Sequence, residues 1–421
     1  MLAGQRRLRH KYGMTDARPL PKFSHYQVFL VAILAFLQFT IILDFMIVSP
    51  LGAIVMPALR INPSQFGLAV SLYAFSAAFS GLMAAGFADR FDRKRLLLFF
   101  YGGFILGTVL CGVAGSYHML LFARIVTGLF GGVVGSVVMA IITDLFALEM
   151  RGRVMGFVQT AFAASQILGL PAGIFFANLW DWHAPFLAVV VLTLPVLAVI
   201  AWKMHPVIAH LAQPQEHSPF LHLWHTLTDR RYLTAFAVTA TITTGGFMLM
   251  PFGSAYLVNN VKISLDHLPT LYLVTGLCTI FAGPIIGRVS DRIGKFPVFV
   301  FGTVLAIVMV FIWTHLGPST LPAVIVINVL LFVAIFSRMI PSQALLSAIP
   351  PPSKRGSFNA VNSSLQQFSG GFASALAGLV VLRGADGALQ HFDMVGYIVI
   401  AASVLSLVFL YFVHKRVPEP H

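Results

Sequence analysis

The sequence predicts an all-α membrane protein with twelve transmembrane helices in two six-helix bundles. Of the 421 residues, 58% are hydrophobic and only 10% are charged. The apolar residues form twelve long runs, and Lys and Arg gather in alternate connections between them. A helical span needs about 20 mostly apolar residues. Continuous runs of this length favour helices over the alternating strands of a membrane barrel.

The apolar runs place the expected helices in two sets, separated by the longest connection. The first set lies near residues 27–57, 64–88, 95–115, 118–144, 151–178 and 184–204. The second set lies near 232–257, 267–288, 296–314, 320–348, 356–382 and 393–413. The chain therefore divides into an N-terminal arm 1–26, a bundle 27–204, a proline-containing linker 205–231, a second bundle 232–413 and a tail 414–421.

The distribution of basic residues predicts the orientation. Of the 27 Lys and Arg residues, 22 lie in the arm, the linker, the tail and the connections on the same side, and three lie in the opposite connections. Positively charged loops are retained in the cytoplasm. We therefore expect a multi-pass protein of the cell inner (plasma) membrane with both termini cytoplasmic. The bilayer is the expected partner of these charges and nucleic acid is not, because they form no aromatic-interleaved patch.

Two sequence markers recur at nearly the same offset and indicate an internal repeat. Asp89-Arg90 follows the second expected span and Asp291-Arg292 follows the eighth, 202 residues later. Arg151-Gly152 opens the fifth span and Arg355-Gly356 opens the eleventh, 204 residues later. In secondary transporters, duplicated halves place the substrate site between them, near the membrane midplane.

The loop after the second span resembles the signature of the major facilitator superfamily, and the resemblance extends over essentially the whole chain. The copy at 287–295 fits the signature well, whereas the first copy has Ala85 and Asp92 where glycines are usual. The resemblance implies a twelve-helix transporter that works by alternating access. It also implies a conformational latch formed by Asp89, Arg90, Arg93, Asp291 and Arg292.

The latch has an expected partner and an alternative explanation. A helix N-terminus favours a nearby carboxylate, so we expect Asp89 to meet the start of the eleventh span, around Gly356 and Ser357. Alternatively, these charges only fix the topology.

Three charged residues lie well inside the expected spans: Asp44, Arg124 and Arg338. A charge at membrane depth is costly unless it is paired or faces a wet cavity, so each is a functional candidate. Asp44 and Arg124 fall at similar depths and can pair. Arg124 lies in a segment that resembles the family's helix-4 arginine motif, which implies proton coupling. We expect Asp44 to carry the proton and Arg124 to tune its proton affinity, with a static structural ion pair as the alternative.

Arg338 has no counterpart at the repeat offset, which maps it to Val134. It precedes Pro341 and is expected either to contact substrate or to stabilise a kink. With two intramembrane cations against one carboxylate, we expect a substrate with an anionic or oxygen-rich polar group.

Polar stripes predict the lining of a substrate cavity. Asn359, Asn362, Gln366 and Ser369 recur at helical spacing on the eleventh span, and Gln159 and Gln166 lie seven residues apart on the fifth. The alternative for each is an interhelical hydrogen bond without substrate contact.

The fifth span bears on the direction of transport. Its Gly169, Pro171 and Gly173 resemble the exporter signature of the family, although Leu170, Ile174 and Phe175 depart from it. We predict a monomeric, proton-coupled exporter of a small drug-like or sugar-like compound, without cofactor, metal or enzymatic activity. An importer or uniporter of a small organic anion or sugar is the alternative.

Overall fold

The computed structural model describes residues 23–208, 211, 225–351 and 355–416, and almost all of them are helical. The first half consists of the following elements: α2 (His25–Ile47), η1 (Ser49–Leu51), α3 (Gly52–Leu59), α4 (Pro63–Phe87), η2 (Ala88–Arg90), α5 (Arg93–Gly112), α6 (Tyr117–Leu145), α7 (Leu148–Ala164), η3 (Ser165–Gly169), α8 (Leu170–Leu179) and α9 (Ala184–Lys203).

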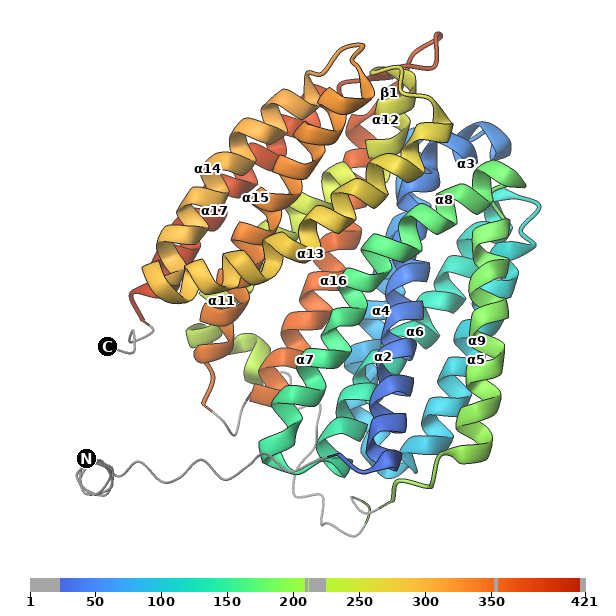
Figure 1. Cartoon of the computed structure of the whole chain (residues 1–421), viewed down its shortest axis with the longest axis vertical. Helices are drawn as coiled ribbons and strands as arrows, with labels where there is room; N and C mark the ends of the chain where they lie inside the picture. Colours follow the sequence, from blue (N-terminus) through green and yellow to red (C-terminus); the bar gives the residue numbers. More distant parts are fainter. Residues whose placement is uncertain (1–22, 209–210, 212–224, 352–354, 417–421) are drawn as a thin grey trace, which may run out of the picture.

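The second half repeats this plan and adds one hairpin (Figure 1). Its elements are α11 (Arg230–Leu249), η5 (Met250–Phe252), α12 (Gly253–Asn259), η6 (Leu265–His267), α13 (Leu268–Ile293), α14 (Lys295–Thr314), α15 (Leu321–Ala348), α16 (Arg355–Val380), β1 (Leu382–Arg383), β2 (Leu389–Gln390) and α17 (Phe392–His414). Most of the predicted arm and linker lie outside the described residues.

The predicted all-α membrane fold is confirmed. Within the described residues, eleven helical segments are long and apolar enough to cross a membrane. The remaining predicted span, the eleventh, corresponds to α16, which has 26 residues but carries amides and hydroxyls that lower its hydropathy. A polar helix among apolar ones needs polar or wet surroundings, so α16 is a candidate for the lining of a polar site.

Local sequence explains where several helices begin and where one is irregular. Ser24 and Asn62 each form a capping box with a glutamine three residues later, which satisfies the first N–H groups of α2 and α4. The fifth span contains a π-helical turn, η3, directly before Pro171. Proline has no N–H to donate to the carbonyl four residues earlier, so the regular hydrogen-bond ladder is interrupted there.

The molecule has two ends, named here for what they carry. The terminal face is the end at which the described chain begins and finishes, and the hairpin face is the end that carries β1 and β2 (Figure 1). In Figure 1 the helices of the two halves converge toward the hairpin face and splay apart toward the terminal face.

The hydrophobic cores follow the same division. The core at the hairpin face draws residues from both halves, including Phe66 and Trp182 from the first and Phe252 and Trp313 from the second. Near the terminal face each half has its own core, one built only from residues 30–207 and the other only from residues 232–413. The two halves therefore pack together at the hairpin face and are separate bodies at the terminal face.

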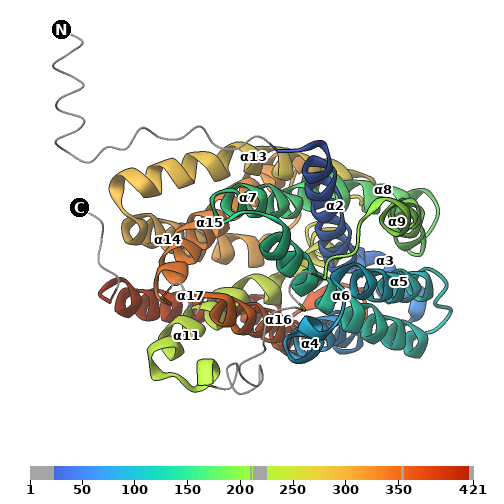
Figure 2. The ribbon, with the colours of Figure 1, turned by 90° about the horizontal axis from the view of Figure 1, so that it is seen from below.

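One pair of helices joins the halves through small residues. A Cβ on Gly67 of α4 would lie 2.7 Å from the carbonyl oxygen of Ser374 on α16. A Cβ on Gly378 of α16 would lie 2.9 Å from the carbonyl oxygen of Pro63. Both views place α4 beside α16 (Figures 1 and 2). Glycines at a helix crossing allow this close backbone approach.

Candidate functional site

The two charges predicted to pair do so, deep inside the first half. Arg124 Nη1 lies 3.0 Å from Asp44 Oδ2, and neither side chain has exposed surface. The same Nη1 also approaches the backbone carbonyl of Asp44 at 3.3 Å. A buried pair is tolerated only when both charges are well partnered, so the surroundings of this pair decide what it can do.

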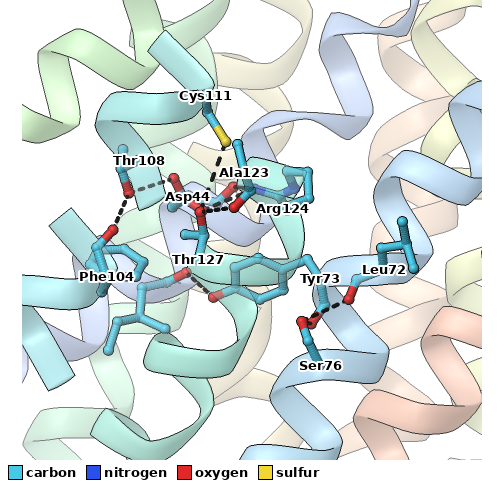
Figure 3. A network of polar contacts seen from close by, with 11 residues as sticks. Asp44, Leu72, Tyr73, Ser76, Phe104, Thr108, Cys111, Ala123, Arg124 and Thr127 are labelled. Atoms are coloured by element: carbon cyan, nitrogen blue, oxygen red, sulfur yellow. Dashed lines mark hydrogen bonds and ion pairs between the residues drawn. The ribbon is translucent and has the colours of Figure 1, made fainter. Parts of the chain in front are cut away.

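Two side chains that sequence analysis did not single out complete the site (Figure 3). Thr108 Oγ1 donates to Asp44 Oδ1 at 3.2 Å, from α5. The Arg124 guanidinium lies over the ring of Tyr73 of α4, 4.4 Å from its centroid. Four helices thus contribute one group each. Arg124 Nε and Nη2 are buried without a hydrogen-bond partner in the described part of the chain, which leaves donors free for a second arrangement of the pair.

Glycines bring these helices close enough to form the site. A Cβ on Gly107 of α5 would meet Thr127 Oγ1 at 2.5 Å, and a Cβ on Gly128 of α6 would meet the Tyr73 carbonyl oxygen at 2.4 Å. Gly131 is close to the Tyr73 hydroxyl, whereas Gly135 faces open space. The glycines of α6 therefore allow close packing around Arg124, and Gly135 faces open space one turn beyond Gly131.

Aromatic rings and tight backbone contacts close the molecule on the hairpin side of the site. Phe45 of α2 packs against Phe247 of α11, with ring centroids 5.6 Å apart, and Phe66 packs against Phe252 at 6.0 Å. Gly276 of α13 abuts η3, where its Cβ would lie 2.8 Å from Ile167 Cα.

On the terminal side of these contacts the halves separate. Gly283 and Gly287 follow Gly276 by seven and eleven residues, so all three share one face of α13. Unlike Gly276, Gly283 and Gly287 would present a Cβ to open space. Gly152 and Gly156 on α7 also face open space. The space between the halves is therefore accessible from the terminal face and blocked at the hairpin face.

The polar stripe on α16 faces this space. Asn359 and Gln366 are exposed on one face of the helix, while Phe368 and Phe372, each more than half exposed, lie on the opposite face. A bilayer accepts the phenylalanines and not the amides, so the amide face points between the halves. Asn362 accepts a 2.6 Å hydrogen bond from Thr239 of α11, and Ser369 is buried. These two are structural members of the stripe.

The fifth span contributes the other predicted amides. Gln159 is exposed on α7 and Gln166 is half-buried in η3. The neighbours of Gln166 fix its direction, because Ser165 donates to the Phe39 carbonyl at 2.9 Å and Leu168 is 63% exposed on the opposite side. Gln166 therefore points away from the bilayer. Gln38 of α2, which the sequence analysis did not single out, has a buried side-chain oxygen without a partner in the described residues.

Arg338 is buried inside the second half. Its Nη2 donates to Ser406 of α17 at 3.0 Å, and its guanidinium lies 5.9 Å from the ring centroid of Phe299 on α14. A Cβ on Gly245 of α11 would lie 3.9 Å from Arg338 Nη1. The structure therefore directs Arg338 toward helices within its own bundle, away from the amide stripe.

The first latch loop is held together by Arg93. This side chain is 4% exposed and contacts Asp89 Oδ1 at 2.6 Å, Asp144 Oδ2 at 3.0 Å and the Ala88 carbonyl at 2.7 Å. Asp144, at the end of α6, was not predicted as part of the loop. Arg90 is exposed. The predicted contact of Asp89 with the start of α16 stays a prediction, because the side chains at 355 and 356 lie outside the described residues.

The departure at Asp92 from the family signature has a structural reason. Its Oδ1 accepts from the backbone N–H of Lys94, which caps α5, and from the N–H of Val207 at the start of the linker. The second latch loop is different, because Asp291 and Arg292 are exposed and form no ion pair in the part of the chain that the structure describes. At the 204-residue offset Asp144 maps to Ala348, so the second loop lacks the matching carboxylate.

Known proteins share this fold. The chain is similar to a bacterial homologue of the human lysosomal transporter Spinster, with a TM-score of 0.75 at 16% identity over 95% of this chain and all of that one. A nucleoside transporter gives a TM-score of 0.71 at 13% identity over 91% of this chain and 98% of that one. At these identities the likeness concerns the fold alone.

Sequence relatives and a family model define the family. The uncharacterised transporter YceJ of Bacillus subtilis is 28% identical over 64% of this chain and 68% of its own length. A probable sugar efflux transporter of Helicobacter pylori is 23% identical over 66% and 69%, and a vacuolar amino acid uptake transporter of Schizosaccharomyces pombe is 32% identical over 32% and 23%. The family model matches residues 34–374 and 239–421. The chain belongs to the major facilitator superfamily.

Proposed function

We propose that this transporter couples proton movement to the efflux of a small, polar, uncharged organic compound, sugar-like or drug-like. The observation that carries the proposal is the fully buried Asp44–Arg124 pair. A structural pair contributes little to stability relative to apolar packing. A carboxylate and guanidinium retained at this depth therefore favour a role in the transport cycle.

The contacts of Asp44 suggest how a proton would change the site. Ionised Asp44 accepts from Arg124 on one oxygen and from Thr108 on the other. Protonation removes its charge and leaves the Arg124 guanidinium without a counter-charge in a low-dielectric interior, which is costly. The guanidinium then favours an arrangement in which its free Nε and Nη2 gain partners. We infer that this rearrangement, at the crossing of α2, α4 and α6, links protonation to movement of the halves.

The lining of the space between the halves supports an uncharged substrate. Its predicted polar groups are amides, with Asn359 and Gln366 exposed on α16 and Gln159 exposed on α7. Amides donate and accept hydrogen bonds without adding charge, which suits hydroxyl-rich or amphiphilic molecules. Asp44 and Arg124 pair with each other, and Arg338 donates to Ser406 within its own bundle, so the proposal does not include an anionic substrate group.

Orientation and direction are part of the same proposal. Because most Lys and Arg lie at the terminal face, we place that face in the cytoplasm, with the protein in the inner membrane. The described state would then accept substrate from the cell interior. The Helicobacter relative named as a sugar efflux transporter supports export. The yeast relative named for amino acid uptake keeps import as the competing direction. One chain supplies both halves, so the proposal requires no second copy.

The proposal is tested in proteoliposomes that carry an imposed pH gradient. A panel of sugars and amphiphilic drugs is first screened for thermal stabilisation of the purified protein, and a stabilising compound is then used as substrate. We expect the gradient to drive that substrate against protons in the wild type. In Asp44→Asn the flux should fall to the level without a gradient, while exchange of substrate without a gradient persists.

Asp266→Asn is the matched control, because Asp266 is an exposed carboxylate at the hairpin face. It should retain the response of the wild type. Undiminished gradient-driven flux in Asp44→Asn would refute the proton role of Asp44. Flux in the same direction as protons would refute export and favour the importer.

A further inference from the structure

A cavity of about 430 Å³ lies in the second half at the terminal face. It is formed where the first turn of α11 meets the residues just beyond the ends of α15 and α17. Arg230, Arg231 and Arg416 supply its charged lining, and Tyr232, Ile349 and Pro351 supply the rest. The cavity is separate from the Asp44–Arg124 site, which belongs to the first half.

The lining of the cavity is cationic, and among the residues that the structure describes no carboxylate contributes to it. The nearest acidic residue along the chain, Asp229, accepts from the backbone N–H of Arg231 and so caps α11. Arg230 and Arg231 occupy the first turn of this 20-residue helix, where the helix dipole also favours an anion. Arg416 Nη1 lies 3.4 Å from Thr234 Oγ1, which holds its side chain against α11. The three guanidinium groups therefore line one cavity, and Asp229 offsets only part of their positive charge.

The position of Arg416 relates the cavity to the bilayer. On α17, Leu405, Val408 and Phe412 recur at three- and four-residue steps and are each about half exposed, which marks the lipid-facing stripe of that helix. Arg416 follows Phe412 by four residues, at the end of that stripe. Beside it, Lys415 Nζ lies 4.6 Å from the ring centroid of Tyr411, as expected for a cation at the level of the lipid headgroups. The cavity thus lies where acyl chains end and headgroups begin.

We propose that this cavity binds the phosphate headgroup of an anionic phospholipid from the leaflet at the terminal face. The guanidinium groups pair with the phosphate oxygens, for which their planar donor geometry is suited. The acyl chains lie along the stripe of Leu405, Val408 and Phe412. The stripe favours a lipid over a soluble phosphate compound, because a soluble ligand gains nothing from an apolar surface at membrane depth. By bridging α11, α15 and α17, the headgroup would hold together three helix ends of the second half.

The test measures lipid binding to the full chain in detergent by native mass spectrometry and by thermal shift. The probes are phosphatidylglycerol, phosphatidylcholine and inorganic phosphate. We expect phosphatidylglycerol to bind in preference to phosphatidylcholine and to raise the melting temperature. Each of Arg230→Gln, Arg231→Gln and Arg416→Gln should weaken phosphatidylglycerol binding by about fivefold. The triple variant should lose the preference.

Two single variants control for the loss of a positive charge as such and for the face of the protein from which it is lost. Arg288→Gln removes an exposed cation of the second half outside the cavity, and Arg383→Gln removes one at the hairpin face. Both should bind phosphatidylglycerol like the wild type. If the triple variant is unstable, Arg416→Lys and Arg416→Gln replace it, and the charge-preserving lysine should retain more binding than the glutamine.

Three results would overturn the proposal. One is equal loss of binding in the cavity variants and the controls, which would indicate a general charge effect. Another is unchanged lipid preference in Arg416→Gln or the triple variant. The third is stabilisation by inorganic phosphate equal to that by phosphatidylglycerol, which would identify a soluble phosphate compound as the occupant.

Discussion

Asp44 and Arg124 show how much the fate of a buried charge depends on its immediate partners. Each has no exposed surface, and the carboxylate is satisfied on both oxygens, by Arg124 and Thr108. The guanidinium is satisfied only in part, through Nη1 and the Tyr73 ring. Both carboxylate oxygens of Asp44 are therefore partnered by groups from two other helices, whereas Arg124 Nε and Nη2 have no hydrogen-bond partner in the described residues.

Removing one partner of this pair should cost more than removing both. Arg124→Leu leaves an unpaired carboxylate in the interior, and we expect it to lower the free energy of unfolding by about 3–5 kcal/mol. Asp44→Leu combined with Arg124→Leu should recover most of that loss, because no charge remains. Thermal unfolding in detergent measures both variants. A double variant as unstable as Arg124→Leu would show that packing around the pair, and not its charge, sets the stability.

At this scale the sequence predicts charged residues well and their neutral partners poorly. Asp44 and Arg124 stand out because charges are rare in apolar runs. Thr108 and Tyr73 do not, since single hydroxyl residues are common in membrane helices and only the helix packing brings them to the pair. Asp144 was missed for a different reason, because it lies at a helix end where a carboxylate is unremarkable.

Among the helices, α16 both lines the space between the halves and packs against the other half. One face carries the amides that point between the halves, and the residues nearer the hairpin face pack through Gly371 and Gly378 against α4. The span boundaries could be predicted to within a few residues, because hydropathy reports the length of each run. Hydropathy alone does not predict the π turn η3 or the 3-10 turns η1 and η5, because it reports the length of a run and not the regularity of its helix; Pro50, Pro171 and Pro251 lie in or next to these turns.

The close contact of α4 with α16 predicts a strong effect of a single methyl group. Gly67→Ala places a Cβ 2.7 Å from the Ser374 carbonyl oxygen, so we expect a loss of about 1–3 kcal/mol in the free energy of unfolding. Gly102→Ala on α5 is the control, because that Cβ would meet nothing within 4 Å. Alanine favours a helix over glycine, so the control should be neutral or stabilising. Thermal unfolding measures both variants, and an equal loss of stability in Gly67→Ala and Gly102→Ala would contradict a close backbone contact between α4 and α16.

For the whole molecule, the described state is open at the terminal face and closed at the hairpin face. The repeat in the sequence predicts two equivalent halves, and the structure confirms the architecture. It also reveals a difference between the two latch loops that the sequence repeat does not predict. Arg93 of the first loop pairs with two carboxylates, whereas the second loop has no equivalent of Asp144. Which face is open could not be predicted, because one sequence must support both states of an alternating-access cycle.

Two positions on one face of α16 report which state is populated. Gln366 is exposed, whereas Ala373, two turns farther along, is fully buried. In a background with Cys111 and Cys278 replaced by alanine, a membrane-impermeant thiol reagent applied at the terminal face should label Gln366→Cys much faster than Ala373→Cys. Saturating substrate should reduce the difference in labelling rate between the two cysteines. Equal labelling of both without substrate would contradict the open terminal face.

The seam between α4 and α16 also bears on how the protein is made. Its two helices are separated by more than 260 residues of chain, so α4 is inserted long before its partner has been synthesised. Until then the glycine face of α4 has only lipid to contact, and the first half must be stable without it. Domains emerge in N-to-C order during translation, so the seam forms among the last long-range contacts. A truncated or stalled chain would therefore leave this face exposed to other membrane proteins. Membrane quality-control proteins could then recognise an unfinished chain by the exposed face around Gly67.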